Sequence, residues 1–169
     1  MSGPTASING ITWLGKGANT HGVVNQSGGT LTVNRGGDFA FVIGDGRFNP
    51  HPTGDYNFTG GWMSSAGEVF VGEGNNSGQS GTGTWTQSGG TANLNNWFVI
   101  GREGGLGTVD LSGSAVLNKT GGGNVAMGDS SNPVGGRIAS MIDFKNFAAM
   151  KAMPIHSAAA SRRGIAARI

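Results

Sequence analysis

The 169-residue sequence contains no cysteine, which excludes disulfide bridges, cysteine-ligated zinc and a thiol nucleophile. Charged residues are also scarce, since Asp, Glu, Lys and Arg make up 12% of the chain, about half of the usual share. No apolar run reaches the roughly 18 residues that a membrane-spanning helix needs. Met1 to Gly10 lacks the basic and apolar regions of a signal peptide, so a secreted form would have lost its leader or be a fragment.

Glycine and apolar residues, by contrast, are abundant: the chain has 34 glycines and is 36% apolar. Disordered chains are highly charged and poor in apolar residues, so regularly placed apolar residues favour an ordered structure here. The net charge of +2 is divided unevenly, with 5 − 8 = −3 over residues 1–136 and 6 − 1 = +5 over residues 137–169. Because the basic excess belongs to the last segment, we expect no nucleic-acid partner for the domain.

An internal repeat organises most of the chain. An apolar pair followed by a glycine, which we call the marker glycine, recurs at steps of 29, 28, 29 and 27 residues: Trp13-Leu14-Gly15, Val42-Ile43-Gly44, Phe70-Val71-Gly72, Val99-Ile100-Gly101 and Ala126-Met127-Gly128. A second motif lies between the markers, as GVVNQSGG (22–29), GDYNFTGG (54–61), GTWTQSGG (83–90) and GTVDLSGS (107–114). Such regular spacing is typical of repeat proteins.

Alternation within each unit predicts β-strands, because successive side chains of a strand point to opposite faces. In the second motif one apolar column consists of Val24, Tyr56, Trp85 and Val109, and the neighbouring polar column consists of Asn25, Asn57, Thr86 and Asp110. Before the marker glycine, the pairs expected to point inward are Phe41/Ile43, Val69/Val71, Phe98/Ile100 and Val125/Met127. A third short stretch supplies Leu31, Met63, Ala92 and Val116.

Three short strands joined by glycine corners in about 28 residues predict one coil of a β-solenoid. We therefore predict an all-β fold, a parallel β-solenoid of about five coils over residues 1–136. Each coil would lie about 4.8 Å from the next, so equivalent side chains such as those of Tyr56 and Trp85 would stack and share one core.

The unit GTWTQSGGTANLNNWFVIGREGGLGT (83–108) resembles the glycine-rich repeat of autotransporter (type V secreted) and PEP-CTERM-associated bacterial surface proteins. The resemblance covers roughly residues 11–130. It implies a right-handed β-helix and an extracellular or cell-surface location, and the family offers no catalytic residues to transfer. The expected function is therefore a non-enzymatic structural or adhesive repeat segment. The alternatives are a carbohydrate-binding module and a subunit that forms filaments by stacking its solenoid ends.

The position after the marker glycine is charged in every unit, as Lys16, Asp45, Glu73, Arg102 and Asp129. Three of the four neighbouring pairs are opposite in sign, which favours an exposed charge ladder. The nearest options for paired catalytic carboxylates, as polysaccharide lyases and hydrolases use, are Asp45 with Glu73 and Asn57 with Asp110. The first pair has no flanking cluster of Arg or Lys, and the second has one acidic member, so we interpret them as solvated charges. We predict no catalytic residue, metal site or cofactor.

A ligand-binding surface is the more plausible kind of site. The corner from Asp45 to Asp55 is long and contains Arg47, Phe48 and His51, and insertions of this kind in solenoids often bind partners. Trp62 and Trp97 fall on the polar phase of the pattern, so they are expected to be exposed and able to stack on sugars. The candidate surface is therefore Trp62, Trp97, Arg47, Phe48 and His51, with extracellular glycans as the expected partner.

The segment 137–169 differs in composition from the repeats, because it is basic, rich in Ala and Met, and contains one glycine, Gly164. Residues Ala139 to Ala152 favour a helix that Pro154 would end, with Ile138, Met141, Ile142 and Met150 on one face. Such a helix would cap the solenoid. Two alternatives remain: a disordered or foreign tail, and a basic amphipathic segment that binds a membrane or a partner.

Overall fold

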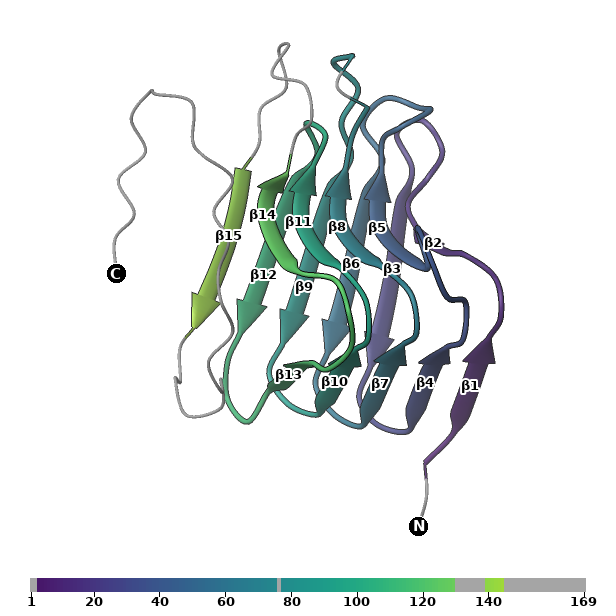
Figure 1. Ribbon diagram of the computed structural model, residues 1–169, viewed down its shortest axis with the longest axis vertical. Coiled ribbons are helices and arrows are strands. Elements are labelled where there is room, and N and C mark those ends of the chain that lie inside the picture. The colour runs from purple at the N-terminus through teal and green to yellow at the C-terminus, as the bar shows by residue number, and fades with distance from the viewer. Residues whose placement is uncertain (1–2, 76, 130–138, 145–169) are drawn as a thin grey trace.

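The computed structural model describes residues 3–75, 77–129 and 139–144, which form strands and loops and contain no helix (Figure 1). Its fifteen strands form three parallel sheets of five strands each. Sheet A consists of β1 (Thr5–Ile8), β4 (Thr30–Val33), β7 (Trp62–Ser65), β10 (Thr91–Leu94) and β13 (Val116–Lys119). Sheet B consists of β2 (Thr12–Leu14), β5 (Phe41–Asp45), β8 (Val69–Glu73), β11 (Phe98–Arg102) and β14 (Val125–Asp129). Sheet C consists of β3 (His21–Gln26), β6 (Thr53–Phe58), β9 (Thr82–Gln87), β12 (Leu106–Leu111) and β15 (Ala139–Phe144).

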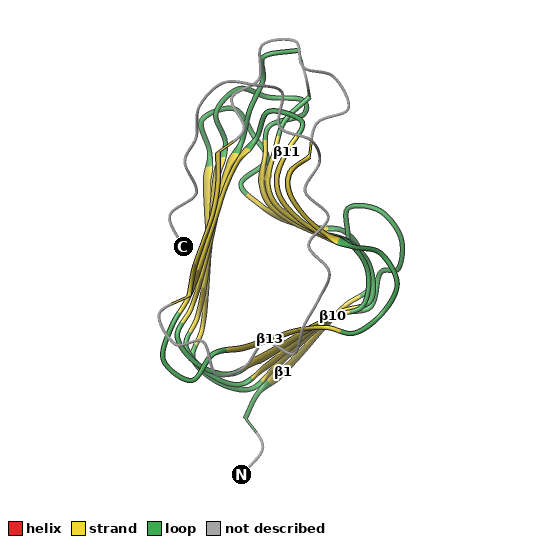
Figure 2. Cartoon of the chain, turned by 60° about the vertical axis from the view of Figure 1, so that its left-hand side comes forward, coloured by secondary structure: helices red, strands yellow, loops and turns green. Residues whose placement is uncertain are grey.

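The chain visits sheets A, B and C in turn and then repeats the circuit, so it winds into a right-handed parallel β-solenoid. Figure 2 shows the three sheets as walls around a common interior, with the loops between sheets A and B bulging outward. The predicted fold class is confirmed. The stack has about four turns with a coil spacing of about 29 residues, instead of about five coils of about 28. Five strands in a sheet are separated by only four steps, which accounts for the lower count.

The interior is lined by the columns that the alternation predicted. In sheet C, Val24 pairs with Tyr56, Tyr56 with Trp85, and Trp85 with Val109. Tyr56 and Trp85 are fully buried, and their rings meet edge to face with centroids 4.8 Å apart. Two glutamine side chains accept hydrogen bonds from these rings: the Tyr56 hydroxyl donates to Gln26, and the Trp85 indole donates to Gln87. A continuous core therefore runs through the stack.

Two expectations are wrong, and one residue of a correctly predicted column is exposed. The residue stacked on Ala92 is Leu117, while Val116 lies opposite Thr91, one position from the predicted column. Met127 belongs to the inward column of sheet B but is 41% exposed, because it lies on the last turn of that sheet in the described part of the chain.

The second wrong expectation is the helix from Ala139 to Ala152. Residues Ala139–Phe144 form β15, which pairs in parallel with β12 from Leu106↔Ala139 to Leu111↔Phe144. Sheet C therefore extends past residue 136, and its last strand has hydrogen bonds from β12 that an isolated helix-forming segment cannot match. The rest of the predicted tail, residues 145–169, lies outside the described residues.

Marker glycines are required by backbone geometry at the end of each sheet B strand. Gly44 and Gly72 have φ angles of 73° and 76°, in the left-handed region where a side chain is strained. A Cβ atom added to Gly44 would also lie 2.1 Å from the carbonyl oxygen of Thr82. This glycine conformation interrupts the two-residue alternation, so the side chain that follows each marker glycine need not continue the pattern of the strand.

Candidate ligand-binding groove on sheet B

The outer face of sheet B carries an apolar stripe made by the first residue of each marker pair. The residues stack in register from turn to turn in the order Trp13, Val42, Phe70, Val99 and Ala126. Val42 is fully buried, and Phe70 and Val99 are each 2% exposed, although they point away from the interior of the solenoid. Both faces of sheet B are therefore buried along its middle strands.

Loops that enter sheet B from sheet A cover this stripe. Phe39, from the loop between β4 and β5, packs on Phe70 with ring centroids 4.9 Å apart and an interplanar angle of 66°. Trp97, just before β11, also packs against the stripe and is half-buried. Between them lies an open depression of about 190 Å³, the sheet B groove, lined by Asp38, Phe39, Glu68, Phe70, Trp97, Val99 and Arg102.

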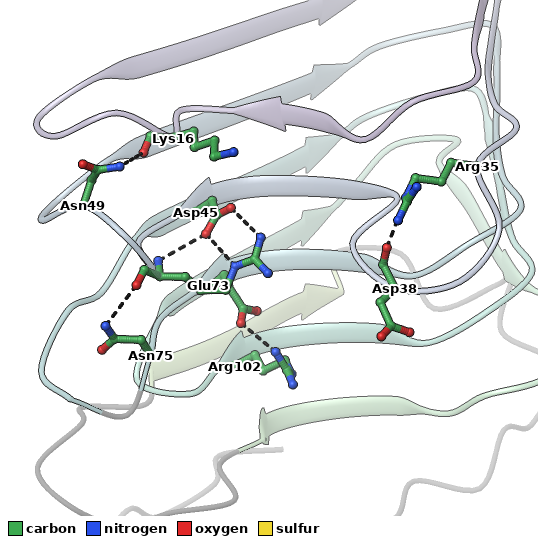
Figure 3. A network of polar contacts seen from close by, with 9 residues as sticks. Lys16, Arg35, Asp38, Asp45, Asn49, Glu73, Asn75 and Arg102 are labelled. Atoms are coloured by element: carbon green, nitrogen blue, oxygen red, sulfur yellow. Dashed lines mark hydrogen bonds and ion pairs between the residues drawn. The ribbon is translucent and has the colours of Figure 1, made fainter.

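Backbone contacts hold the walls of the groove in place. Phe39 has a φ of 54°, which is uncommon for a residue with a side chain and costs about 1–3 kcal/mol. The amide of Glu68 donates to the carbonyl of Gly37 at 2.9 Å, so the loops of successive turns are bonded to each other. The Arg35 side chain donates to the carbonyl of Asp38 at 3.4 Å (Figure 3). Contacts with the neighbouring turn thus hold Phe39 over Phe70 in spite of its strained backbone.

A cluster of buried and half-buried charges from three successive turns lies beside the groove, and its Glu73–Arg102 ion pair joins two of these turns (Figure 3). We call it the buried charge cluster: Asp45, Arg47, Glu73, Arg102 and Glu103. Arg47 donates to both carboxylate oxygens of Asp45, at 2.9 and 2.7 Å. Arg102 lies 2.7 Å from Glu73 and 2.9 Å from Glu103. Asp45 and Glu73 are register partners and are both fully buried.

This arrangement corrects the prediction of an exposed charge ladder after the marker glycine. The register was right, since Asp45 pairs with Glu73, Glu73 with Arg102, and Arg102 with Asp129. The expected solvent exposure of Asp45 and Glu73 was wrong, and so was the statement that no arginines flank them. Arg47 comes from the corner after β5 and pairs with Asp45, two positions earlier in the sequence.

Burial and charge act differently on the carboxyl groups. Burial opposes ionisation of Asp45, but its hydrogen bonds with Arg47 and the charge of Arg47 outweigh burial and lower its pKa. Burial raises the pKa of Glu73 to about 8, against the opposing effect of Arg102. Glu73 Oε2 is buried without a hydrogen-bond partner in the described part of the structure. Burial, together with the nearby charge of Asp38, raises the pKa of Glu68 in the groove.

The two arginines also lie against the aromatic walls. The guanidinium carbon of Arg47 is 3.5 Å from the centroid of the Phe39 ring. That of Arg102 is 5.2 Å from the Phe70 centroid and 5.5 Å from the Phe39 centroid. Cation–π contacts of this kind contribute about 0.5–2 kcal/mol each. The arginines therefore link the buried carboxylates to the rings that form the groove.

The predicted ligand-binding residues are distributed over several places. Trp97 lines the groove, and Arg47 supports it through Phe39. Phe48 is 67% exposed beside these residues, with its ring centroid 5.3 Å from the guanidinium carbon of Arg47. His51 is exposed at a corner and has a φ of 54°.

Trp62 lies elsewhere. It is 46% exposed on β7 of sheet A, where it stacks between Thr30 and Thr91. Trp97 lies just before β11, at the position that Glu68 occupies one turn earlier. It therefore belongs to a different column from Trp62.

Sequence reasoning missed the groove because it assigned only one face of each strand to the core. The run Phe41-Val42-Ile43 is apolar at every position, as strands buried on both faces usually are. The same continuous pattern recurs in Val69-Phe70-Val71 and Phe98-Val99-Ile100. That signal was present, but it did not indicate which loop covers the outer face.

Comparison with protein-family models, curated proteins and solved structures gives no match to this chain. Within the described ranges there is no helix of sufficient length and apolar character to cross a membrane. The same part of the chain contains no group of three or more His, Cys, Asp or Glu side chains arranged to hold a metal ion.

Proposed function

We propose that this chain is a non-enzymatic structural or adhesive segment of a bacterial extracellular or cell-surface protein. The observation that supports the proposal most is the in-register stack of three parallel sheets around one core. A stack of this kind is a stiff rod that grows by about 4.8 Å for each turn. It also presents equivalent loops side by side, and repeat proteins use such extended surfaces to bind partners.

The chemistry of the stacked carboxylates favours this role over catalysis. Asp45 and Glu73 are closed off from solvent and engaged by Arg47 and Arg102. A carboxyl group that acts on a polysaccharide has to reach the scissile bond. These two groups fit a structural role, because Asp45 holds the corner that contains Arg47 and Glu73 pairs with Arg102 of the next turn.

Adhesion is testable with beads coated with the whole chain. Coated beads should be retained under flow on surfaces that carry bacterial or host glycans, and beads coated with an unrelated protein of similar size should wash off. The same glycans, incubated with the soluble chain, should release no reducing ends and no unsaturated products. Release of such products would replace the proposal with an enzymatic one, and equal retention of both bead types would contradict adhesion.

A second candidate function is self-assembly through the ends of the stack. The exposure of Met127 in the inward column supports it, because an apolar core residue at a solenoid end favours contact with a further turn. Sedimentation velocity over a wide concentration range should then reveal rods of increasing length. A monomer at every concentration, with no filaments in electron micrographs, would contradict this candidate.

A further inference from the structure

We propose that the sheet B groove binds a single neutral sugar ring within a glycan chain, with Phe39 and Trp97 contacting the ring above the buried Phe70. This inference rests on the proposed adhesive function and gives it a site and a ligand class. It differs from the predicted tryptophan surface, because Trp62 takes no part in it and Phe39 and Phe70 were not among the predicted residues.

The walls of the groove suit the apolar side of a sugar. A pyranose presents C–H groups on one face and hydroxyl groups around its edge. Phe39 and Trp97 are half-buried aromatic side chains that line the groove, together with the nearly fully buried Phe70 and Val99. Aromatic faces carry partial negative charge and attract the positively polarised C–H groups of such a ring. Because the Arg47 guanidinium lies over the Phe39 ring, Trp97 provides the main aromatic face.

The polar rim suits the hydroxyl edge. Asp38 is exposed and Glu68 is half-buried, and both line the groove. The two carboxyl groups are close enough that the charge of Asp38 contributes to the raised pKa of Glu68. Carboxylate oxygens accept hydrogen bonds from hydroxyl groups, and these charge-assisted bonds are stronger than neutral ones.

The same rim disfavours anionic ligands. Asp38 and Glu68 would repel the carboxylate of a uronic acid, a sulfate or a phosphate. Arg102 is the cation among the lining residues, and its guanidinium already pairs with Glu73 at 2.7 Å and with Glu103 at 2.9 Å. It is therefore committed to the buried charge cluster instead of forming an anion clamp. Neutral hexose units fit this distribution of charge better than acidic ones do.

The volume of the groove limits what it holds. At about 190 Å³ it is smaller than the roughly 300–1,000 Å³ of pockets that enclose drug-sized ligands. One ring of a longer chain fits this size, with the neighbouring units outside. Affinity for one ring is expected near a Kd of about 1 mM, and many copies on a surface would raise the overall avidity by about 10²–10⁴.

The groove is built before any ligand arrives. Phe39 is fixed by the edge contact with Phe70 and by the guanidinium of Arg47 at 3.5 Å. A site of this kind loses little conformational entropy on binding. These contacts keep Phe39 in its strained left-handed backbone conformation.

The test is affinity electrophoresis of the whole chain in gels that contain dextran, yeast mannan, a galactan or polygalacturonate. We expect at least one neutral polysaccharide to slow migration and polygalacturonate to have no such effect. Trp97→Ala should weaken the retardation about tenfold, and Asp38→Ala, a change at an exposed position, should weaken it by a smaller factor. Trp62→Ala is the matched control, because it removes an exposed tryptophan outside the groove and should leave migration unchanged.

Trp97→Phe distinguishes loss of the ring from loss of the fold, since it keeps an aromatic wall and should retain most of the retardation. The inference is overturned if no neutral glycan slows the chain, if only polygalacturonate does, or if Trp62→Ala has the same effect as Trp97→Ala. Retention of Trp97→Ala beads at the level of the unaltered chain would refute the groove but leave the adhesive function standing. Loss of retention for the unaltered chain itself would refute both.

Discussion

Sheets B and C are built from the same repeat, but the outer face of sheet B is apolar and buried while that of sheet C is polar. In sheet C the outward column is Asn25, Asn57, Thr86 and Asp110, all polar, and the Asn57 side chain donates to Asn25 at 2.8 Å. In sheet B the outward column includes Val42, Phe70 and Val99, which are at most 2% exposed. A solenoid sheet needs only one buried face, so a second buried face indicates an added layer that the repeat itself does not require.

The added layer is made by loops, and it contains aromatic side chains and buried ion pairs. The loops between sheets A and B contribute Phe39 and Trp97, and the strand ends contribute the buried charge cluster. Sheet C has a polar side-chain contact as well, a hydrogen bond between His21 and Asp55 at 2.6 Å, but these side chains are 55% and 33% exposed. Burial therefore separates the two faces more clearly than the type of residue does.

The largest expected effect comes from removing the floor of the outer layer. Phe70→Ala should lower the free energy of unfolding by about 3–5 kcal/mol, because it leaves a cavity between Phe39 and Val99. Asn57→Ala, at the outward position of sheet C, should cost about 0.5 kcal/mol or less. Urea denaturation of both variants measures the contrast. Equal losses would show that the outer face of sheet B is not a packed layer.

A somewhat smaller effect is expected from breaking the buried ion pair. Arg102→Met removes the cation that lowers the pKa of the fully buried Glu73, so Glu73 is protonated at pH 8 and loses its hydrogen-bond partner, at an expected cost of about 1.5–3 kcal/mol. The double variant Arg102→Met/Glu73→Leu should recover much of that loss, since an apolar pair replaces a buried polar group that has lost its partner. No recovery in the double variant would mean that Arg102 acts mainly through Phe39 and Glu103.

The pH dependence of stability should carry the signature of Glu73. Its pKa is about 8 in the folded state and near the ordinary value of 4.5 when unfolded, so the folded state binds the extra proton between these values. The stabilisation is complete below pH 4.5 and is lost as the pH rises through 8. We expect a loss of about 1.4 kcal/mol or more between pH 5 and pH 8, the equivalent of one pKa unit.

Glu73→Gln should abolish the loss of stability between pH 5 and pH 8 and leave the loss of stability at acidic pH unchanged. Asp45 contributes to the acidic loss, because its lowered pKa gives stability that is present above its ordinary pKa of 3.8 and is lost as the pH falls through the folded value. Denaturation at a series of pH values in both proteins provides the comparison. A slope that persists in Glu73→Gln would assign the effect to another group.

The smallest effect belongs to the exposed pair on sheet C. His21→Ala should change the free energy of unfolding, measured by urea denaturation, by about 0.2–1 kcal/mol. A loss as large as that of Arg102→Met would erase the distinction between the two faces.

Much of the fold could be predicted from the sequence, but the candidate site could not. Alternation in the columns of Tyr56 and Trp85 and the recurrence of the marker glycines predicted the register of sheet C and most of sheet B, and these are confirmed. The prediction that Asp45 and Glu73 are exposed was wrong, because the left-handed glycine before each of them ends the alternation on which the prediction depended. β15 was predicted as a helix, since local propensity carries no information about a neighbouring strand edge.

Spacing and two-residue periodicity determined by themselves that this chain winds into stacked parallel strands with one apolar interior, because identical units can bury their inward columns only by lying on one another. Tertiary structure alone decided what covers the outer side of sheet B. The position of Phe39 over Phe70, and the meeting of Arg102 with Glu73 from the turn before, depend on how neighbouring loops settle against each other across the stack. That information is held in contacts between turns, not in the pattern of any one turn.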